Sequence, residues 1–304
     1  MNTFKIILFL LSLFIFQMSV AEPIRKPNIK KTIDRLKKIN VVANSDLIPG
    51  DIGPLLKKLK SQLVGLVLKD LIIEGDGVFD LKRIQKVKEG IFSELKNDGI
   101  GLGHMNAQVV EGSSADNSEY FQYGDINSID IESVSGYPGL IIGTTSIGLA
   151  CGDDNSLYIF SKNEGEWKFI FSDQVDEYGS TELARGDFNF GFLKGNDRNR
   201  LFLITVYVSP ACNSNWTRIF YSVFKIDLLN SKTVEIYKNN QSIFVGNDEP
   251  YYSLETGLND FALKFYGNKP QSADLYFRTI KFNLNNDHVF QTSVSFDPNL
   301  EKGF

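Results

Sequence analysis

Several segments in the second half of the chain are apolar at nearly every position, and this pattern constrains the fold most. Residues 201–206 read LFLITV, and residues 157–160 read LYIF. A sheet with one face in water alternates polar and apolar side chains, which these segments do not. They therefore predict strands that are buried on both faces, between the layers of a sandwich or between the blades of a propeller.

β-branched and aromatic residues dominate the segments that we expect to be strands. These are residues 140–145, 157–161, 167–172, 201–209, 218–228, 233–237, 242–245, 261–266, 274–284 and 289–292. The turn signals between them are short, for example Asn163-Glu164-Gly165, and short connections require antiparallel neighbours. The sequence thus predicts a mainly β protein of antiparallel meandering sheets, sandwich-like or propeller-like. We favour an open arrangement over a closed propeller, because no propeller repeat is present.

Helical spacing precedes the strands. Residues 54–73 carry leucines three and four apart, with lysines expected on the opposite face. A second helix is expected over residues 81–96, with Asp80 as its N-cap and Asn97-Asp98-Gly99 as its stop. The expected order is a helical region at 46–119, including a polar loop at 106–119, and an antiparallel β domain at 120–304.

The first 21 residues have the layout of a secretory signal peptide. Lys5 precedes the apolar run of residues 6–16, and Ser19-Val20-Ala21 supplies small residues before a cut. An uncleaved anchor is the alternative. No later segment is apolar for long enough to be a transmembrane helix. We therefore expect an extracytoplasmic protein, periplasmic or secreted.

The net charge of −5 hides a basic segment near the N-terminus. Its cations are Arg25, Lys26, Lys30, Lys31, Arg35, Lys37 and Lys38. The remaining body is acidic, which argues against nucleic acid as a partner. The basic segment at 22–45 could touch an anionic membrane, but we favour a flexible, solvated tail.

The expected oxidising compartment favours a disulfide between the two cysteines of the chain. Cys151 and Cys212 are an even count, so we expect a disulfide between them rather than two free thiols. A closed loop of this size stabilises a fold by about 4 kcal/mol in the chain-entropy model.

The acidic run after Cys151 raises the question of a metal site. Asp153 and Asp154 are adjacent, whereas calcium loops space carboxylates at alternate positions and end on a distant Glu. We interpret the run as the loop before a hairpin, with Asp153 and Asp154 as weak metal candidates only. The segments 124–133 and 186–192 also begin like propeller calcium loops, but loop or strand edge is the better interpretation. No cofactor is predicted.

Catalytic constellations are scarce in the sequence. His104 and His288 are the only histidines, and neither accompanies a recognisable nucleophile motif. A carboxylate pair of the glycosidase type needs no histidine, but nothing singles out such a pair. We therefore name no catalytic residue and lean away from an enzyme.

Aromatic residues next to polar loops are the remaining binding candidates. Trp216 follows a polar segment that contains Cys212, and Tyr251 and Tyr252 lie in the segment DEPYYSLE. Such rings can stack on sugars or on protein partners. The alternative is that they cap the core.

Two motifs in the β region resemble a known group. The chain pairs CGDDNSLY, residues 151–158, with SPACNSNW, residues 209–216. This combination resembles a group of uncharacterised secreted bacterial proteins, over roughly residues 126–284. The resemblance implies a shared fold and the pairing of Cys151 with Cys212, and it supplies no catalytic residue.

Together these features predict a non-enzymatic extracytoplasmic protein whose β domain binds a protein or glycan partner at a cell surface. Two alternatives stay open at this point: a secreted polysaccharide hydrolase that uses a carboxylate pair, and a propeller-like calcium-binding protein.

Overall fold

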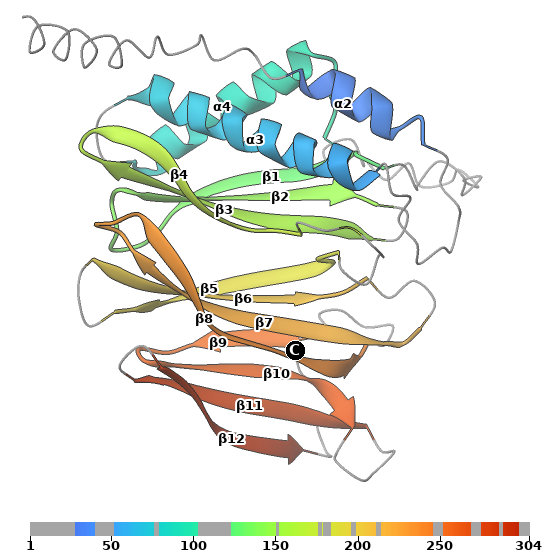
Figure 1. Cartoon of the computed structure of the whole chain (residues 1–304), viewed down its shortest axis with the longest axis vertical. Coiled ribbons are helices and arrows are strands. Elements are labelled where there is room, and N and C mark those ends of the chain that lie inside the picture. The colour runs from blue at the N-terminus through green and yellow to red at the C-terminus, as the bar shows by residue number, and fades with distance from the viewer. Residues whose placement is uncertain are drawn as a thin grey trace, which may run out of the picture.

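The protein is described by a computed structural model, which covers residues 28–39, 52–75, 79–102, 123–149, 152–175, 178, 184–195, 199–210, 214–245, 252–268, 275–285 and 288–297. Its strands form three antiparallel four-stranded meanders, one after another along the chain. The sheets are stacked face to face in an open pile, and the helices cover the outer face of the first (Figure 1). The predicted mainly β, sandwich-like architecture is confirmed.

The helical layer contains three helices in the described residues. Helices α3 (Ile52–Glu74) and α4 (Leu81–Asn97) match the two predicted helices, and the Asp80 side chain accepts the Arg83 N–H at 2.9 Å as expected of an N-cap. Helix α2 (Ile29–Leu36) lies in the segment expected to be a flexible tail. That expectation is wrong for these residues, because Ile29, Ile33 and Leu36 are buried against the other helices and the first sheet.

Sheet 1 consists of β1 (Ile126–Ser133), β2 (Leu140–Gly148), β3 (Asp153–Asn163) and β4 (Glu166–Asp173). Its β3–β4 turn has two residues, because Asn163 pairs with Glu166. Glu164 and Gly165 both have positive φ, at 53° and 85°. This is the pattern of a type I′ hairpin, and it confirms the expected turn.

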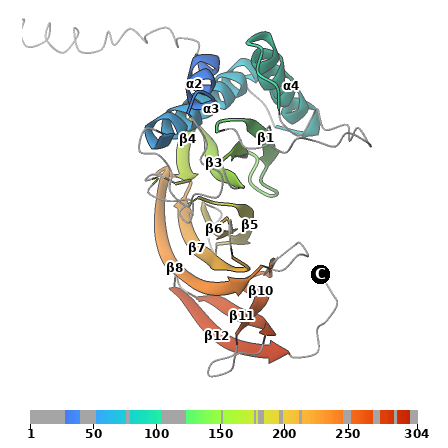
Figure 2. The same cartoon turned by 90° about the vertical axis from the view of Figure 1, so that its right-hand side faces the viewer.

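Sheet 2 consists of β5 (Asp187–Lys194), β6 (Arg200–Val208), β7 (Trp216–Asp227) and β8 (Lys232–Phe244). The two strands expected at 233–237 and 242–245 are one continuous strand, β8, with a register shift opposite Val223 and Phe224. In the side view, β8 curves along the edge of the stack of sheets (Figure 2). A bulge of this kind bends a strand without ending it, which sequence propensity does not reveal.

Sheet 3 consists of β9 (Tyr252–Thr256), β10 (Asp260–Asn268), β11 (Leu275–Asn285) and β12 (His288–Asp297). Strands β1, β5 and β9 were not among the predicted strands. Each is the first strand of its sheet and lies at an edge. Their sequences, INSIDIES, DFNFGFLK and YSLET, contain Asp, Asn, Glu, Ser or Gly between the apolar residues, so their strand signal is weak.

Three apolar interfaces hold the layers together. The helices pack on one face of sheet 1, sheet 1 packs on sheet 2 through residues such as Leu157 and Leu203, and sheet 2 packs on sheet 3. Strands β2, β3 and β6 are therefore buried on both faces, as the sequences of β3 and β6 predicted. Strand β10 alternates instead, with Phe261, Leu263 and Phe265 turned toward sheet 2. Among the described helices, none has the length and apolar character needed to cross a membrane.

Candidate functional site

The acidic run that raised the metal question starts strand β3 rather than forming a loop. Asp153 and Asp154 pair with Gly148 and Ile147 of β2. Successive side chains of a strand point to opposite faces, so Asp154 is directed toward the helices and Asn155 toward sheet 2. The loop interpretation was wrong because the strand continues through these polar residues to make contacts on both sides.

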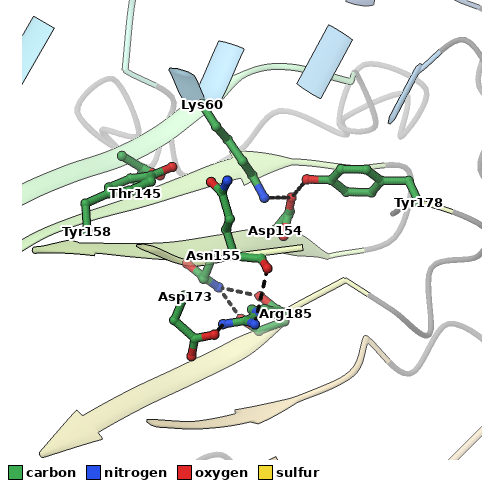
Figure 3. A network of polar contacts seen from close by, with 10 residues as sticks. Lys60, Thr145, Asp154, Asn155, Tyr158, Asp173, Tyr178 and Arg185 are labelled. Atoms are coloured by element: carbon green, nitrogen blue, oxygen red, sulfur yellow. Dashed lines mark hydrogen bonds and ion pairs between the residues drawn. The ribbon is translucent and has the colours of Figure 1, made fainter. Parts of the chain in front are cut away.

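On the helix side, Asp154 forms an ion pair with a lysine of α3. The Lys60 Nζ lies 2.6 Å from Asp154 Oδ2, and both side chains are wholly buried. The Tyr178 hydroxyl donates a hydrogen bond to the same carboxylate oxygen, and the Lys60 ammonium lies 5.2 Å from the centre of the Tyr178 ring (Figure 3). A buried carboxylate must be paired and hydrogen-bonded to be tolerated, and these two partners supply that.

The environment of this carboxylate also shifts the tyrosines around it. Burial raises the pKa of Tyr178 far above its ordinary value, and the nearby Asp154 charge and hydrogen bond raise it further. Burial likewise raises the pKa of Tyr158 to about 12, although hydrogen bonds with Thr145 and Ser156 oppose the shift. Both phenols are therefore neutral at physiological pH.

On the sheet 2 side, Asn155 binds the segment that leads into β5. Its backbone N–H and its side-chain amide donate to the Arg185 carbonyl at 2.8 and 3.0 Å, and the amide also donates to the Gly186 carbonyl. The Arg185 guanidinium forms an ion pair with Asp173 at the end of β4 and lies 4.7 Å from the centre of the Tyr207 ring of β6. We call these six residues, Lys60, Asp154, Asn155, Asp173, Tyr178 and Arg185, the polar hub.

Gly186 explains how the chain passes so close to sheet 2 at this point. A Cβ at Gly186 would lie 2.7 Å from the Val208 carbonyl oxygen and 3.2 Å from the Pro210 nitrogen. Any larger residue would push the β5 entry away from β6 and break the Asn155 contacts.

The polar hub acts as a structural connection between three layers. Its charged groups are buried and face one another, so the arrangement positions the helices and sheet 2 on opposite faces of β3. The cation beside Asp154 is a lysine ammonium. Both oxygens of the other candidate, Asp153, accept hydrogen bonds, from Asn127 at 2.7 Å and from Ser146 at 2.8 Å. Within the described ranges, no group of His, Cys, Asp or Glu is placed to hold a metal ion.

The two calcium-loop-like segments are the edge strands β1 and β5. In β1, Asp130 forms an ion pair with Lys88 of α4. Both segments thus lie largely in edge strands rather than in loops.

Local sequence patterns do not indicate that Lys60, Tyr178 and Arg185 lie at one site. Lysines of α3 were expected on the exposed face, and for Lys60 this is wrong. A signal for Lys60 exists in hindsight: it lies four residues after Leu56 and three before Leu63, on the buried stripe of the helix. Tyr178 and Arg185 lie outside regular elements, so periodicity could not select them.

Cys151 and Cys212 lie outside the described residues, but residues beside them are described. A Cβ at Gly152 would lie 3.3 Å from Pro210 Cβ, so the chain next to Cys151 runs against the chain two residues before Cys212. His104 and Tyr251 also lie outside the described residues.

The two aromatic candidates within the described residues, Trp216 and Tyr252, differ in exposure. Tyr252 is 4 % exposed, and its hydroxyl donates to the Val206 carbonyl at 3.3 Å, so it is a core residue and its prediction as a binding residue is wrong. Burial raises its pKa well above the ordinary tyrosine value. Trp216, by contrast, is 38 % exposed at the first position of β7 and lies edge-on to Phe244, with ring centres 5.3 Å apart.

Trp216 belongs to a row of side chains on one face of sheet 2. Arg218 and Phe220 follow it at alternate positions of β7, and Phe244 of β8 pairs directly with Trp216. Phe220 stacks on Tyr207, with ring centres 4.9 Å apart, which anchors the inner end of the row. Trp216 and Arg218 are exposed at its outer end. We call Trp216, Arg218, Phe220 and Phe244 the β7–β8 aromatic face.

Comparison with known proteins adds no assignment to this geometry: no model of a protein family matches the chain, and no curated protein matches it significantly.

Proposed function

We propose that this protein is a non-enzymatic, extracytoplasmic binding protein that engages a protein or glycan partner at a cell surface through the β7–β8 aromatic face. The observation that carries the proposal is the exposure of Trp216 beside Phe244 and Arg218. Trp and Arg are the residues that contribute most binding energy at interfaces, whereas most large apolar side chains of this fold are buried in its layers.

The architecture supports a binding role for this face. Phe244 and the Tyr207–Phe220 stack hold the aromatic side chains of β7 in place, so little side-chain entropy is lost when a partner binds. The polar hub fixes the adjoining segment before β5, because Arg185 stacks on the same Tyr207 ring. The aromatic face is thus mounted on rigid strands rather than on a loop.

The extracytoplasmic location rests on the signal-peptide pattern of residues 1–21 and on the expected disulfide. The contact between Gly152 and Pro210 supports a Cys151–Cys212 pair, because it brings the flanking backbones within reach of a bridge. Thiol titration of the unreduced, denatured protein should find no free thiol, and two free thiols would contradict the pair.

The aromatic face is tested by binding of the purified protein to intact bacterial and host cells and to arrayed cell-surface glycans. Trp216→Ala should weaken binding at least tenfold, because one hot-spot side chain contributes roughly 2 kcal/mol or more. Its melting temperature should stay close to that of the unmodified protein.

Phe290→Ala is the matched control. Phe290 is 53 % exposed on β12 of sheet 3, away from the aromatic face, and its removal should leave binding unchanged. Equal losses in the two variants, or no loss in Trp216→Ala, would show that the partner binds elsewhere.

A further inference from the structure

A pocket of about 370 Å³ opens where sheets 1 and 2 meet, at the end of the stack that contains the β1–β2, β3–β4 and β7–β8 turns. Its size is within the range of small-molecule sites. The polar side chains that line it come from Tyr137, Ser161, Asn163 and Asn199, and apolar ones come from Pro138, Leu140, Leu228 and Leu229.

The walls of this crevice pocket are fixed by hydrogen bonds. On the sheet 1 side, the Tyr137 N–H donates to the Val134 carbonyl, the Leu140 N–H to the Tyr137 carbonyl, and the Tyr137 hydroxyl reaches the Arg200 carbonyl of sheet 2 at 3.2 Å. On the other side, the Leu228 N–H donates to the Asn199 carbonyl at 2.9 Å. Because these hydrogen bonds already hold the walls in place, little conformational entropy is lost when a ligand binds.

Several charged residues lie near the pocket, and Lys162 is one of its lining residues. The Lys194 Nζ lies beside Gly136, 3.8 Å from where a Cβ at that position would be. The side chains of Lys162 and Asp227 are directed elsewhere. Lys162 alternates with Ser161 and Asn163 along β3, so its side chain lies on the helix-facing side, 5.9 Å from the Trp167 ring centre. Asp227 accepts hydrogen bonds from the Leu229 and Asn230 N–H groups and the Asn230 amide within its own turn, and these bonds lower its pKa. Among the described lining residues, none is Asp or Glu.

The geometry points to a binding site for a neutral sugar unit in the crevice pocket. Carboxamides and hydroxyls can exchange hydrogen bonds with sugar hydroxyls in both directions, while the Tyr137 ring and the leucines can cover the apolar C–H face of a pyranose. A cationic ligand would find no carboxylate among the described lining residues.

This site is separate from the β7–β8 aromatic face and does not rest on it. Trp216 begins β7, and Asp227, next to Leu228, ends it. At about 3.3 Å per residue the two ends lie on the order of 35 Å apart. An experiment that rules out binding at one site therefore does not bear on the proposal for the other.

The test is saturation-transfer NMR on the full chain with a panel of methyl hexosides, N-acetylglucosamine and, as a charged comparison, glucuronate. At least one neutral sugar should bind in the millimolar range and should bind more tightly than glucuronate. Ser161→Leu, which fills the pocket, should abolish the signal, and Asn163→Ala should weaken binding roughly fivefold through loss of a hydrogen bond.

Asn283→Ala is the control, because Asn283 is exposed on sheet 3 and far from the pocket. It should bind sugar normally, and so should Trp216→Ala. Absence of binding to every neutral sugar, tighter binding of glucuronate, or binding that survives Ser161→Leu would overturn the proposal. If Ser161→Leu fails to fold by circular dichroism, Asn163→Ala decides.

Discussion

The helix–sheet 1 interface and the sheet 2–sheet 3 interface solve the same packing problem in different ways. The first surrounds a buried ion pair, Lys60 with Asp154, by leucines and isoleucines. The second is filled by aromatic rings, among them Phe261 and Phe282, which stack with centres 4.5 Å apart at 12°. Of these two interfaces, as far as the structure describes them, the first contains the buried pair of opposite charges.

The two interfaces contribute differently to the stability and to the specificity of the fold. Apolar burial stabilises an interface wherever shapes fit, and it tolerates small shifts between layers. A buried ion pair contributes little net stability, because desolvation offsets its attraction, but it penalises every arrangement that separates the two charges. We infer that Lys60 and Asp154 fix where α3 sits on sheet 1, whereas sheets 2 and 3 are held mainly by aromatic packing.

The largest expected effect is at the ion pair. Asp154→Ala should lower the free energy of unfolding by about 5 kcal/mol, because it leaves the Lys60 ammonium buried without its partner. Urea denaturation of the single variant and of Lys60→Met with Asp154→Leu checks this. The double variant should recover most of the loss, and a double variant as unstable as the single one would contradict the proposed role of the pair.

The aromatic interface should respond differently. Phe282→Ala should cost about 4 kcal/mol through lost burial and a cavity between sheets 2 and 3. Phe282→Leu should cost about 1.5 kcal/mol, because most of the volume is kept. Urea denaturation measures both, and a graded response to volume is the expected sign of apolar packing. Equal costs for the two substitutions would mean that volume does not govern this interface.

Two tyrosine hydroxyls allow a matched comparison between the interfaces. The Tyr178 hydroxyl donates to a carboxylate, and the Tyr252 hydroxyl donates to a backbone carbonyl. Tyr178→Phe should cost about 2 kcal/mol and Tyr252→Phe about 1 kcal/mol, because hydrogen bonds to charged groups are stronger. Thermal unfolding at pH 7 checks the order, and the reverse order would remove the distinction between the two interfaces.

These tyrosines also give a pH dependence. Both pKa values are raised in the folded state, so above the ordinary tyrosine pKa the unfolded chain loses protons first. Their contribution to stability is complete below pH 10 and falls as the pH rises above it. Either phenylalanine variant should lose stability less steeply than the unmodified protein in alkaline urea titrations.

The smallest effect concerns Asp70 of α3, which lies against Gly90 of α4. Burial raises its pKa, Lys69 opposes the shift, and Glu94 and Glu74 add to it. The folded state therefore favours protonated Asp70, and stability falls as the pH rises from about 4 through the raised pKa. Asp70→Asn should stabilise the protein by about 1 kcal/mol at pH 7 and by nothing near pH 3, as urea titrations at the two pH values would show. An equal gain at both would exclude the titration of Asp70 as its cause.

Local sequence signals predicted much of the fold. Apolar spacing and the Asp80 N-cap placed α3 and α4, and the doubly apolar segments identified β3 and β6 as strands between layers. These signals succeed because helix caps, turns and side-chain alternation depend on neighbours a few residues apart. The strands β1, β5 and β9 were missed because polar residues and glycine interrupt their apolar pattern or because the strand is short.

The candidate site was less accessible to the same reasoning. Local pattern alone shows that Asp153, Asp154 and Asn155 precede a strand core next to Cys151, and that Trp216 and Tyr252 lie near polar segments. The folded structure is needed to see that Asp154 meets Lys60, that Asn155 meets Arg185, and that Trp216 is exposed while Tyr252 is buried. The physical reason is that a side chain's charge partner and its access to water depend on which layer covers it, and residues far away in the chain supply that layer.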